Sequence, residues 1–372
     1  MRFAALAFLT FMLAAACGRN PADPSADQTP AAEPAAAPVS DELPGLAAPA
    51  TDIDFWDHPT LSFNGMMIVA TANGVYAYNM EDGNPAAQID GVNAAGVAVS
   101  YLGFGREAAG FAAVLDATAD AFRFYGIDNS ARAFLPLNDG PAAPGDIKGF
   151  CLGRALQSDA PALFVVVEGK ILVYNLAAGG DGIVVESESA IGTPGDIASC
   201  AVDIDGVLLA GSDTGAVYRI AGDDAFAAPF ARAIGAGAGE LTVLMAAGET
   251  GAPVGGQILF ADLSSGTMHL FDRVSGAALG AAKLAATDNL PGVDAAEAFG
   301  ATAANLGALY RNGVVAYGVA AGADGPVVRL APVSSVRNAL AVPVGEPVSP
   351  RGAAPAVEDG ILDIPTTFTP EE

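Results

Sequence analysis

Side chains that commonly carry out catalysis are scarce in this chain of 372 residues, which contains two histidines, His58 and His269. His58 follows Trp56 and Asp57 and could touch a site, but we interpret it as the cap of a turn. His269 lies in an alternating polar and apolar segment, which is typical of a residue on the face of a strand. The sequence has no Gly-x-Ser-x-Gly nucleophile elbow and no His/Cys cluster with metal-ligand spacing. These patterns therefore give no indication of nucleophilic or zinc chemistry.

Acidic residues are the abundant kind of ionisable side chain. The chain has 42 Asp and Glu against 16 Lys and Arg, which gives a formal net charge of -26. Affinity for nucleic acids comes from Lys and Arg on phosphates, so we expect no nucleic-acid partner. An acidic surface of this kind attracts divalent cations and repels free polyanions unless cations intervene.

The N-terminus has the features of a secretory leader. Arg2 begins an apolar run that ends at Ala16, directly before Cys17, and this run is too short to span a membrane as a mature helix. Its Ala-Ala-Ala-Cys ending resembles the bacterial lipobox, with an ordinary signal peptide as the alternative. We expect residues 1–16 to be removed, Cys17 to be lipidated, and the lipid to be the only membrane contact. Gly18, in place of Asp, is typical of transfer to the outer membrane of the bacterial envelope, facing the periplasm or the exterior.

Two segments are rich in Pro and Ala and poor in large apolar side chains. Residues 17–50 have this composition, which predicts a flexible tether between the lipid and a folded domain. Residues 344–372 form a similar Pro-rich acidic tail, in which Ile361 and Leu362 either pack on the domain or remain free. The body between them, residues 51–343, is long enough for one large core.

The body repeats one unit six times. A short apolar strand, a Gly/Asp/Asn turn and a second apolar or aromatic strand recur about every 50 residues, a period typical of propeller blades or solenoid repeats. We predict an all-β, monomeric, six-bladed β-propeller with four-stranded antiparallel blades. The last interval is the longest, which indicates one irregular blade or a misplaced edge. The repeated pairs are 66–69 with 75–78, 113–115 with 122–125, 163–167 with 171–174, 207–209 with 217–220, 258–260 with 268–271, and 314–316 with 327–330.

The two remaining cysteines, Cys151 and Cys200, occupy matching positions. Each follows a Pro-Gly-Asp-Ile turn, at Pro144 and Pro194, and each is expected on the innermost strand of its blade. A disulfide between them is compatible with secretion. We favour two buried free thiols, because inner strands of neighbouring blades need not bring their Cα atoms within bridging range.

Several segments, taken in order, resemble the β-propeller phytase family. Residues 51–59 resemble the opening Asp-Asp-Pro-Ala-Ile-Trp-x-His-Pro of that family, and 149–152 resemble its Gly-Phe-Cys-Leu. Residues 200–203 resemble Cys-Val-Val-Asp, 292–294 resemble Gly-Ile-Asp, and 328–332 resemble the closing Phe-Lys-Leu-Val-Pro. The matches span nearly all of the body and agree with the six-blade period.

The resemblance implies an activity and a cofactor. Enzymes of this family hydrolyse phosphomonoesters of inositol hexakisphosphate with several Ca²⁺ ions held by acidic side chains at one mouth of the channel. Such ions neutralise the substrate phosphates, activate a bound water and stabilise the leaving oxygen. The positions that correspond to metal ligands here are Asp52, Asp146 and Asp294. A reduced site could also draw on Asp54, Asp57 and Glu240.

Much of the family's ligand set is nevertheless replaced. Thr51 stands in place of one opening Asp, and the segment 95–100 lacks the Asp and Arg of the family's Asn-Asn-Val-Asp-x-Arg. Residues 198–199 are Ala-Ser in place of Glu-Gly, and 211–213 are Gly-Ser-Asp in place of Glu-Glu-Asp. The residues that remain are mainly those that strands and turns require. We therefore expect ordered binding of several calcium ions to be lost.

Two functions of different classes follow, because a propeller fold serves both. The first is a phytase-like lipoprotein propeller with weak or lost phosphomonoesterase activity, which binds a protein or a phosphorylated small molecule. The second is an active Ca²⁺-dependent phytase with a reduced site. Convergence of three or more carboxylates at one channel mouth would favour the enzyme.

Overall fold

The computed structural model describes residues 33–351, apart from 44, 102–107, 157–159, 180–181, 221–227, 248–252, 323–324 and 344. The expected leader and the lipid attachment residue, Cys17, lie outside this range, as do Ile361 and Leu362 of the tail. Among the described residues, no helix is both long enough and apolar enough to cross a membrane.

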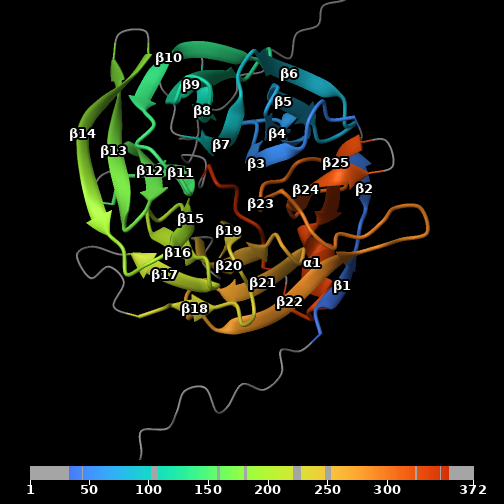
Figure 1. Cartoon of the computed structure of the whole chain (residues 1–372). Coiled ribbons are helices and arrows are strands. Elements are labelled where there is room, and N and C mark those ends of the chain that lie inside the picture. Colours follow the sequence, from blue (N-terminus) through green and yellow to red (C-terminus); the bar gives the residue numbers. More distant parts are fainter. Residues whose placement is uncertain are drawn as a thin grey trace, which may run out of the picture. The chain divides into compact units, whose positions relative to one another are not determined.

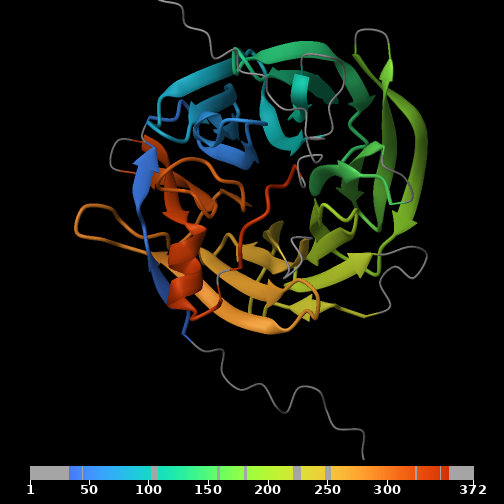
Figure 2. The ribbon, with the colours of Figure 1, turned by 180° about the vertical axis from the view of Figure 1, so that it is seen from behind.

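Six sheets stand around a central axis, and each contains four consecutive blade strands or three with an added N-terminal strand, with the first strand of the blade innermost (Figure 1). The view from behind shows the same ring (Figure 2). Blade 1 consists of β3 (Ala50–Trp56), β4 (Met66–Thr71), β5 (Gly74–Asn79) and β6 (Pro85–Asp90). Blade 2 consists of β7 (Ala94–Ser100), β8 (Ala108–Asp116), β9 (Ala121–Asp128) and β10 (Phe134–Ala142). Blade 3 consists of β11 (Gly149–Arg154), β12 (Pro161–Val167), β13 (Lys170–Gly179) and β14 (Gly182–Gly192).

Blades 4 to 6 continue the ring, and the N-terminal strands complete the last two of them. Blade 4 consists of β15 (Ile197–Val202), β16 (Leu208–Ser212), β17 (Ala216–Ile220) and β18 (Ala231–Arg232). Blade 5 consists of β19 (Gly239–Ala247), β20 (Pro253–Asp262), β21 (Thr267–Asp272) and β22 (Ala278–Ala285), with β1 (Ala35–Pro38) as a fifth strand. Blade 6 consists of β23 (Ala298–Thr302), β24 (Val314–Gly322) and β25 (Gly325–Pro332), with β2 (Asp41–Leu43) as its fourth strand. Two short helices are η1 (Ser62–Asn64) and α1 (Val333–Ala339).

The predicted six-bladed β-propeller is confirmed. The six repeated strand pairs of the sequence coincide with the second and third strands of the six blades. All residues of β4 and all but the first residue of β12 are buried, because a neighbouring blade packs on each face of these strands. One interblade cluster, for example, packs Phe55 and Met67 of blade 1 against Val314 of blade 6. Burial on both faces explains why these strands read as continuous apolar runs.

The N-terminal segment corrects the expectation of a tether over the whole of 17–50. Its residues 35–38 form β1, which pairs in parallel with β22, and residues 41–43 form β2, which pairs antiparallel with β25 as the fourth strand of blade 6. Small residues suffice here because backbone hydrogen bonds supply much of the pairing at a sheet edge. Val39, Leu43 and Leu46 are buried as well. The ordered propeller therefore begins before residue 51.

The long last repeat comes from two long connections. Residues 286–297 join β22 to β23, and residues 303–313 join β23 to β24. The second connection ends at Gly313, which has a φ of 94°. A Cβ atom at this glycine would lie 2.1 Å from the carbonyl oxygen of Thr302, so the turn requires glycine at this position.

Candidate functional site

The inner strands of the six blades surround a cavity of about 600 Å³ in the central channel. A volume of this size is in the usual range for small-ligand sites. Several glycines line the cavity, including Gly96, Gly149 and Gly300. Each of these glycines lies so close to a neighbouring blade that a Cβ atom would clash there. The ionisable groups that line the cavity include Asp52, Asp54 and Glu240.

Asp52 and Asp54 are two residues apart on β3 and so project from the same face of the strand. The Asp52 carboxylate accepts hydrogen bonds from the backbone N–H of Ile53, at 2.8 Å, and of Val97, at 2.9 Å. The Asp54 carboxylate accepts the N–H of Phe55 and of Val99, each at 2.7 Å. Since the two valines lie on β7, both carboxylates fasten blade 1 to blade 2.

Burial raises the pKa of both carboxyl groups. Desolvation is the largest cause, and it raises the pKa of Asp52 to about 6 and that of Asp54 to about 7, although the backbone donors oppose the shift. The negative charge of Asp52 raises the pKa of Asp54 further. Both groups therefore titrate near neutrality.

Glu240 plays the corresponding role between blades 5 and 6. It lies on β19, and its Oε2 accepts the N–H of Phe299 on β23 at 3.0 Å. Thr242 adds a hydroxyl donor to the carbonyl of Ala301 at 3.0 Å. Burial, followed by the charge of Asp52, raises the pKa of Glu240 well above its usual range. Channel carboxylates at two blade junctions thus accept backbone donors of the next inner strand.

A buried ion pair joins blades 4 and 5. Arg273 donates from Nη1 to Oδ2 of Asp203 at 2.5 Å and from Nη2 to Oδ2 of Asp205 at 2.9 Å. Oδ1 of Asp203 also accepts the N–H of Asp205 and of Val207, both at 2.9 Å, which holds the turn after β15. The two Asp side chains are thereby committed to this turn and to Arg273.

The three predicted metal ligands lie in different surroundings. Asp52 faces the channel, whereas Asp146, in the turn before β11, and Asp294, in the connection before β23, are exposed and outside the cavity wall. Within the described part of the chain, no group of three or more His, Cys, Asp or Glu side chains is arranged to hold a metal ion. A calcium ion takes six to eight oxygen ligands. The three residues predicted to bind calcium therefore do not lie together in this structure.

Both histidines occupy structural positions. Nε2 of His58 lies 3.0 Å from the carbonyl of Asn129, and its Nδ1 accepts the N–H of Thr60 at 3.2 Å and of Leu61 at 3.0 Å. His58 is thus a turn cap, as predicted. His269 lies on β21, as predicted, and pairs across the sheet with Phe260. Burial lowers the pKa of both histidines, which favours their neutral form.

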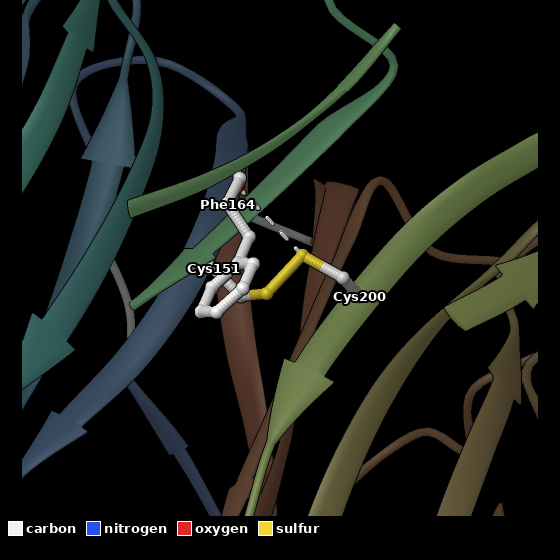
Figure 3. Close-up of a disulfide and its surroundings, with 3 residues drawn as sticks. All are labelled: Cys151, Phe164 and Cys200. Atoms are coloured by element: carbon white, nitrogen blue, oxygen red, sulfur yellow. Dashed lines mark hydrogen bonds between the residues drawn. A yellow bond between two sulfur atoms is a disulfide. The ribbon is translucent and has the colours of Figure 1, made fainter. Parts of the chain in front are cut away.

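A disulfide joins Cys151 of β11 to Cys200 of β15, with a Cα–Cα distance of 5.8 Å (Figure 3). The expectation of two free thiols is therefore wrong. The two cysteines occupy equivalent positions on adjacent inner strands, and the strands approach closely enough near the axis to bring the Cα atoms within bridging range. The sulfur of Cys200 also lies 3.9 Å from the carbonyl oxygen of Phe164.

One part of the site had no signal in the sequence analysis. Residues 345–351, which we call the C-terminal strap, cross one mouth of the channel, and Pro350 and Arg351 line the cavity. Figure 1 and Figure 2 show this segment in red at the centre of the ring. Its proline-rich composition predicted a tail, and a single Arg in such a segment does not reveal where it binds.

Comparison with known proteins identifies no family for this chain. No protein-family model and no curated protein matches the chain. Two solved structures of Hsv2 from Kluyveromyces lactis are similar at 11% identity, with TM-scores of 0.35 and 0.38. The alignments cover 62% and 63% of this chain and 63% of each Hsv2 chain, so the match spans less than two thirds of that protein. The strand topology identifies this chain as a six-bladed β-propeller.

Proposed function

We propose that this protein is a ligand-binding β-propeller of the bacterial envelope, anchored through a lipid on Cys17, with little or no phosphomonoesterase activity. It is phytase-like in the order of its strand and turn motifs. The observation that carries the proposal is the use of the channel carboxylates, because Asp52, Asp54 and Glu240 accept backbone N–H groups of neighbouring blades. The resemblance implies a metal ligand at Asp52, and a reduced site could also draw on Asp54 and Glu240, so these hydrogen bonds engage the side chains that such a site would need.

The charge of the channel bears on the class of ligand. Asp52, Asp54 and Glu240 face the cavity, and the whole chain carries a net charge of -26. The charge of the whole chain repels a free polyphosphate at long range unless calcium intervenes, although Lys148, Arg154 and Arg351 also line the cavity. A neutral or cationic ligand, such as a segment of a partner protein, meets no such long-range repulsion.

The alternative is an active Ca²⁺-dependent phytase with a reduced site. One observation favours it, namely that three carboxylates do face the same channel. Calcium would then have to displace the backbone donors from Asp52, Asp54 and Glu240, or bind a carboxylate oxygen that also accepts a hydrogen bond. Such binding requires the carboxylates to be ionised.

Calorimetric titration with Ca²⁺, followed by a phosphate-release assay with inositol hexakisphosphate, distinguishes the two functions. The mature chain would carry Cys17→Ser, which keeps it free of lipid, and would first be freed of metal. The proposal predicts neither tight binding of several ions nor turnover. Tight multi-site binding with turnover would contradict it and establish the enzyme. Mass spectrometry of the native mature chain would show whether Cys17 is acylated.

A further inference from the structure

The C-terminal strap is held at the channel mouth by the edge of one blade and the end of another. The N–H of Ala247 donates to the carbonyl of Glu346 at 2.7 Å, and the N–H of Val348 donates to the carbonyl of Met245 at 3.1 Å. The strap thus runs along the end of β19 in blade 5, where Ala246 and Pro347 form an antiparallel bridge. From there it reaches Asp57, directly after β3 of blade 1.

At this point Arg351 of the strap lies close to two aromatic rings. The guanidinium carbon of Arg351 lies 4.8 Å from the centre of the Tyr101 ring and 5.5 Å from that of Trp56. Its Nε donates to the carbonyl oxygen of Asp57 at 2.5 Å, and Nη2 donates to the same oxygen. The Asp57 carboxylate also accepts the hydroxyl of Ser349. We call Trp56, Asp57 and Tyr101 the guanidinium cage.

Contacts within the propeller position two members of the cage. Trp56 is fully buried at the end of β3. The Tyr101 hydroxyl donates to the carbonyl of Phe55 at 2.6 Å and accepts the N–H of Asp57 at 3.3 Å, which fixes the Tyr ring beside β3. Side chains positioned by such contacts require little reorganisation when a ligand binds.

The chemistry of the cage favours arginine over lysine. A guanidinium is planar, stacks on aromatic faces and donates from several nitrogens at once, whereas an ammonium is a compact and strongly hydrated charge. Two donors of Arg351 converge on one carbonyl oxygen, and the guanidinium carbon lies near the centres of two rings. The net charge of -26 of the whole chain adds a long-range attraction for a cationic segment.

We propose that the cage is a recognition site for arginine in an extended peptide of a partner protein, and that the strap occupies this site in cis until the partner peptide replaces it. The proposal rests on the binding role proposed above. The contacts described above are of kinds that a peptide can supply, namely backbone pairing with β19, an arginine in the cage and a hydroxyl on the Asp57 carboxylate. Replacement would also open the channel mouth that Pro350 and Arg351 line.

Trp56 is the only tryptophan of the chain and lies in the cage, so its fluorescence reports what occupies this site. The probe is the synthetic peptide Gly-Glu-Pro-Val-Ser-Pro-Arg with a C-terminal amide, titrated into the mature Cys17→Ser chain and into the same chain with Arg351→Ala. The latter should bind the peptide at least about tenfold more tightly, because its own strap no longer competes. Arg232→Ala, which removes an exposed arginine on β18, is the matched control and should behave like the parent.

A second peptide, in which citrulline replaces arginine, keeps the shape and removes the charge. It should bind the Arg351→Ala chain about tenfold or more weakly than the arginine peptide. Equal affinity of the two peptides, or equal affinity of the arginine peptide for the parent and for Arg351→Ala, would overturn the proposal. If Arg351→Ala does not fold, Arg351→Lys serves in its place, with the same expected order of affinities. If the peptides do not bind as predicted and no phosphate is released from inositol hexakisphosphate, only the peptide site is refuted and the proposed binding role stands. Phosphate release in the presence of calcium would refute the binding role separately.

Discussion

Two junctions between neighbouring blades join the same kind of strand with different chemistry. Between blades 3 and 4, a disulfide connects the inner strands through Cys151 and Cys200. Between blades 1 and 2, Asp52 and Asp54 of one inner strand accept N–H groups of the next. The first junction is covalent and depends on the redox compartment, whereas the second depends on the ionisation of two buried carboxyl groups. The comparison shows that polar residues facing a channel can belong to the scaffold, although their types suggest a site.

The largest loss of stability is expected from removing the N-terminal strands, which join the propeller through neither a disulfide nor a channel carboxylate. A chain shortened to begin at residue 51 lacks β1 and β2, and it loses the buried side chains of Val39, Leu43 and Leu46. Each contributes about 1.5–3 kcal/mol of burial, so the loss is roughly 5 kcal/mol or more and comparable to the stability of a whole domain.

Chemical unfolding monitored by circular dichroism would measure this loss. The matched control begins at residue 33 and keeps both strands. The shortened chain should be largely unfolded or aggregated, because the edges of β22 and β25 are then uncovered. Identical unfolding midpoints for the two chains would show that the N-terminal strands do not close the ring.

The covalent junction is expected to give the next largest effect. Replacing both cysteines, as Cys151→Ala with Cys200→Ala, releases a loop of 49 residues. Loop entropy of the unfolded chain then lowers the free energy of unfolding by roughly 4 kcal/mol. Unfolding of the parent chain in the presence of a reductant is the control and should reach the same value. A change below about 1 kcal/mol would indicate that the inner strands need no covalent tie.

The carboxylate junction should give the smallest effect, and one that depends on pH. The folded pKa of Asp54 is raised to about 7, above its value in the unfolded chain, so the folded state binds more protons than the unfolded state between these values. Stability from this group therefore increases as the pH falls from about 8 towards 5. The group is partly in contact with the channel, so we expect a contribution on the order of 1–2 kcal/mol.

Asp54→Asn tests this dependence. The substitution removes the titration and also costs an acceptor for one backbone N–H, but this second cost does not change with pH. The difference in melting temperature between parent and variant should thus vary from pH 8 to pH 5. Asp294→Asn, at an exposed position, is the control and should not alter the pH profile. A parallel profile for parent and Asp54→Asn would contradict the assigned role.

The sequence was sufficient to predict the strands of the blades, but not the strand pairing and the disulfide that join distant parts of the ring. Apolar runs such as 66–69 and 163–167 predicted the buried middle strands, because their pattern depends on local burial alone. The pairing of β1 with β22 joins residues more than 240 positions apart through backbone groups, which leave little trace in composition. The distance between the Cα atoms of Cys151 and Cys200 depends on how closely adjacent blades approach the axis, which the sequence pattern does not give.

The candidate site was predicted less well than the fold. The family resemblance drew attention to Asp52, which does face the channel, and to Asp146 and Asp294, which lie exposed in loops. Asp54 and Glu240 belonged to the wider set of acidic residues, and their hydrogen bonds to the next blade required the three-dimensional register. The position of Arg351 in the guanidinium cage depends on a tail whose composition alone predicts no contact.

The central claim is that the channel carboxylates tie the blades together and do not hold several calcium ions. Its most direct test is the melting temperature of the metal-free mature Cys17→Ser chain at pH 7.5, measured with increasing Ca²⁺ and with Mg²⁺ as the reference ion. Ions that bind the folded state raise the melting temperature in a saturable way. We predict the same small change for both ions. A saturable rise specific to Ca²⁺, abolished by Glu240→Gln, would contradict the claim and identify a calcium site in the channel.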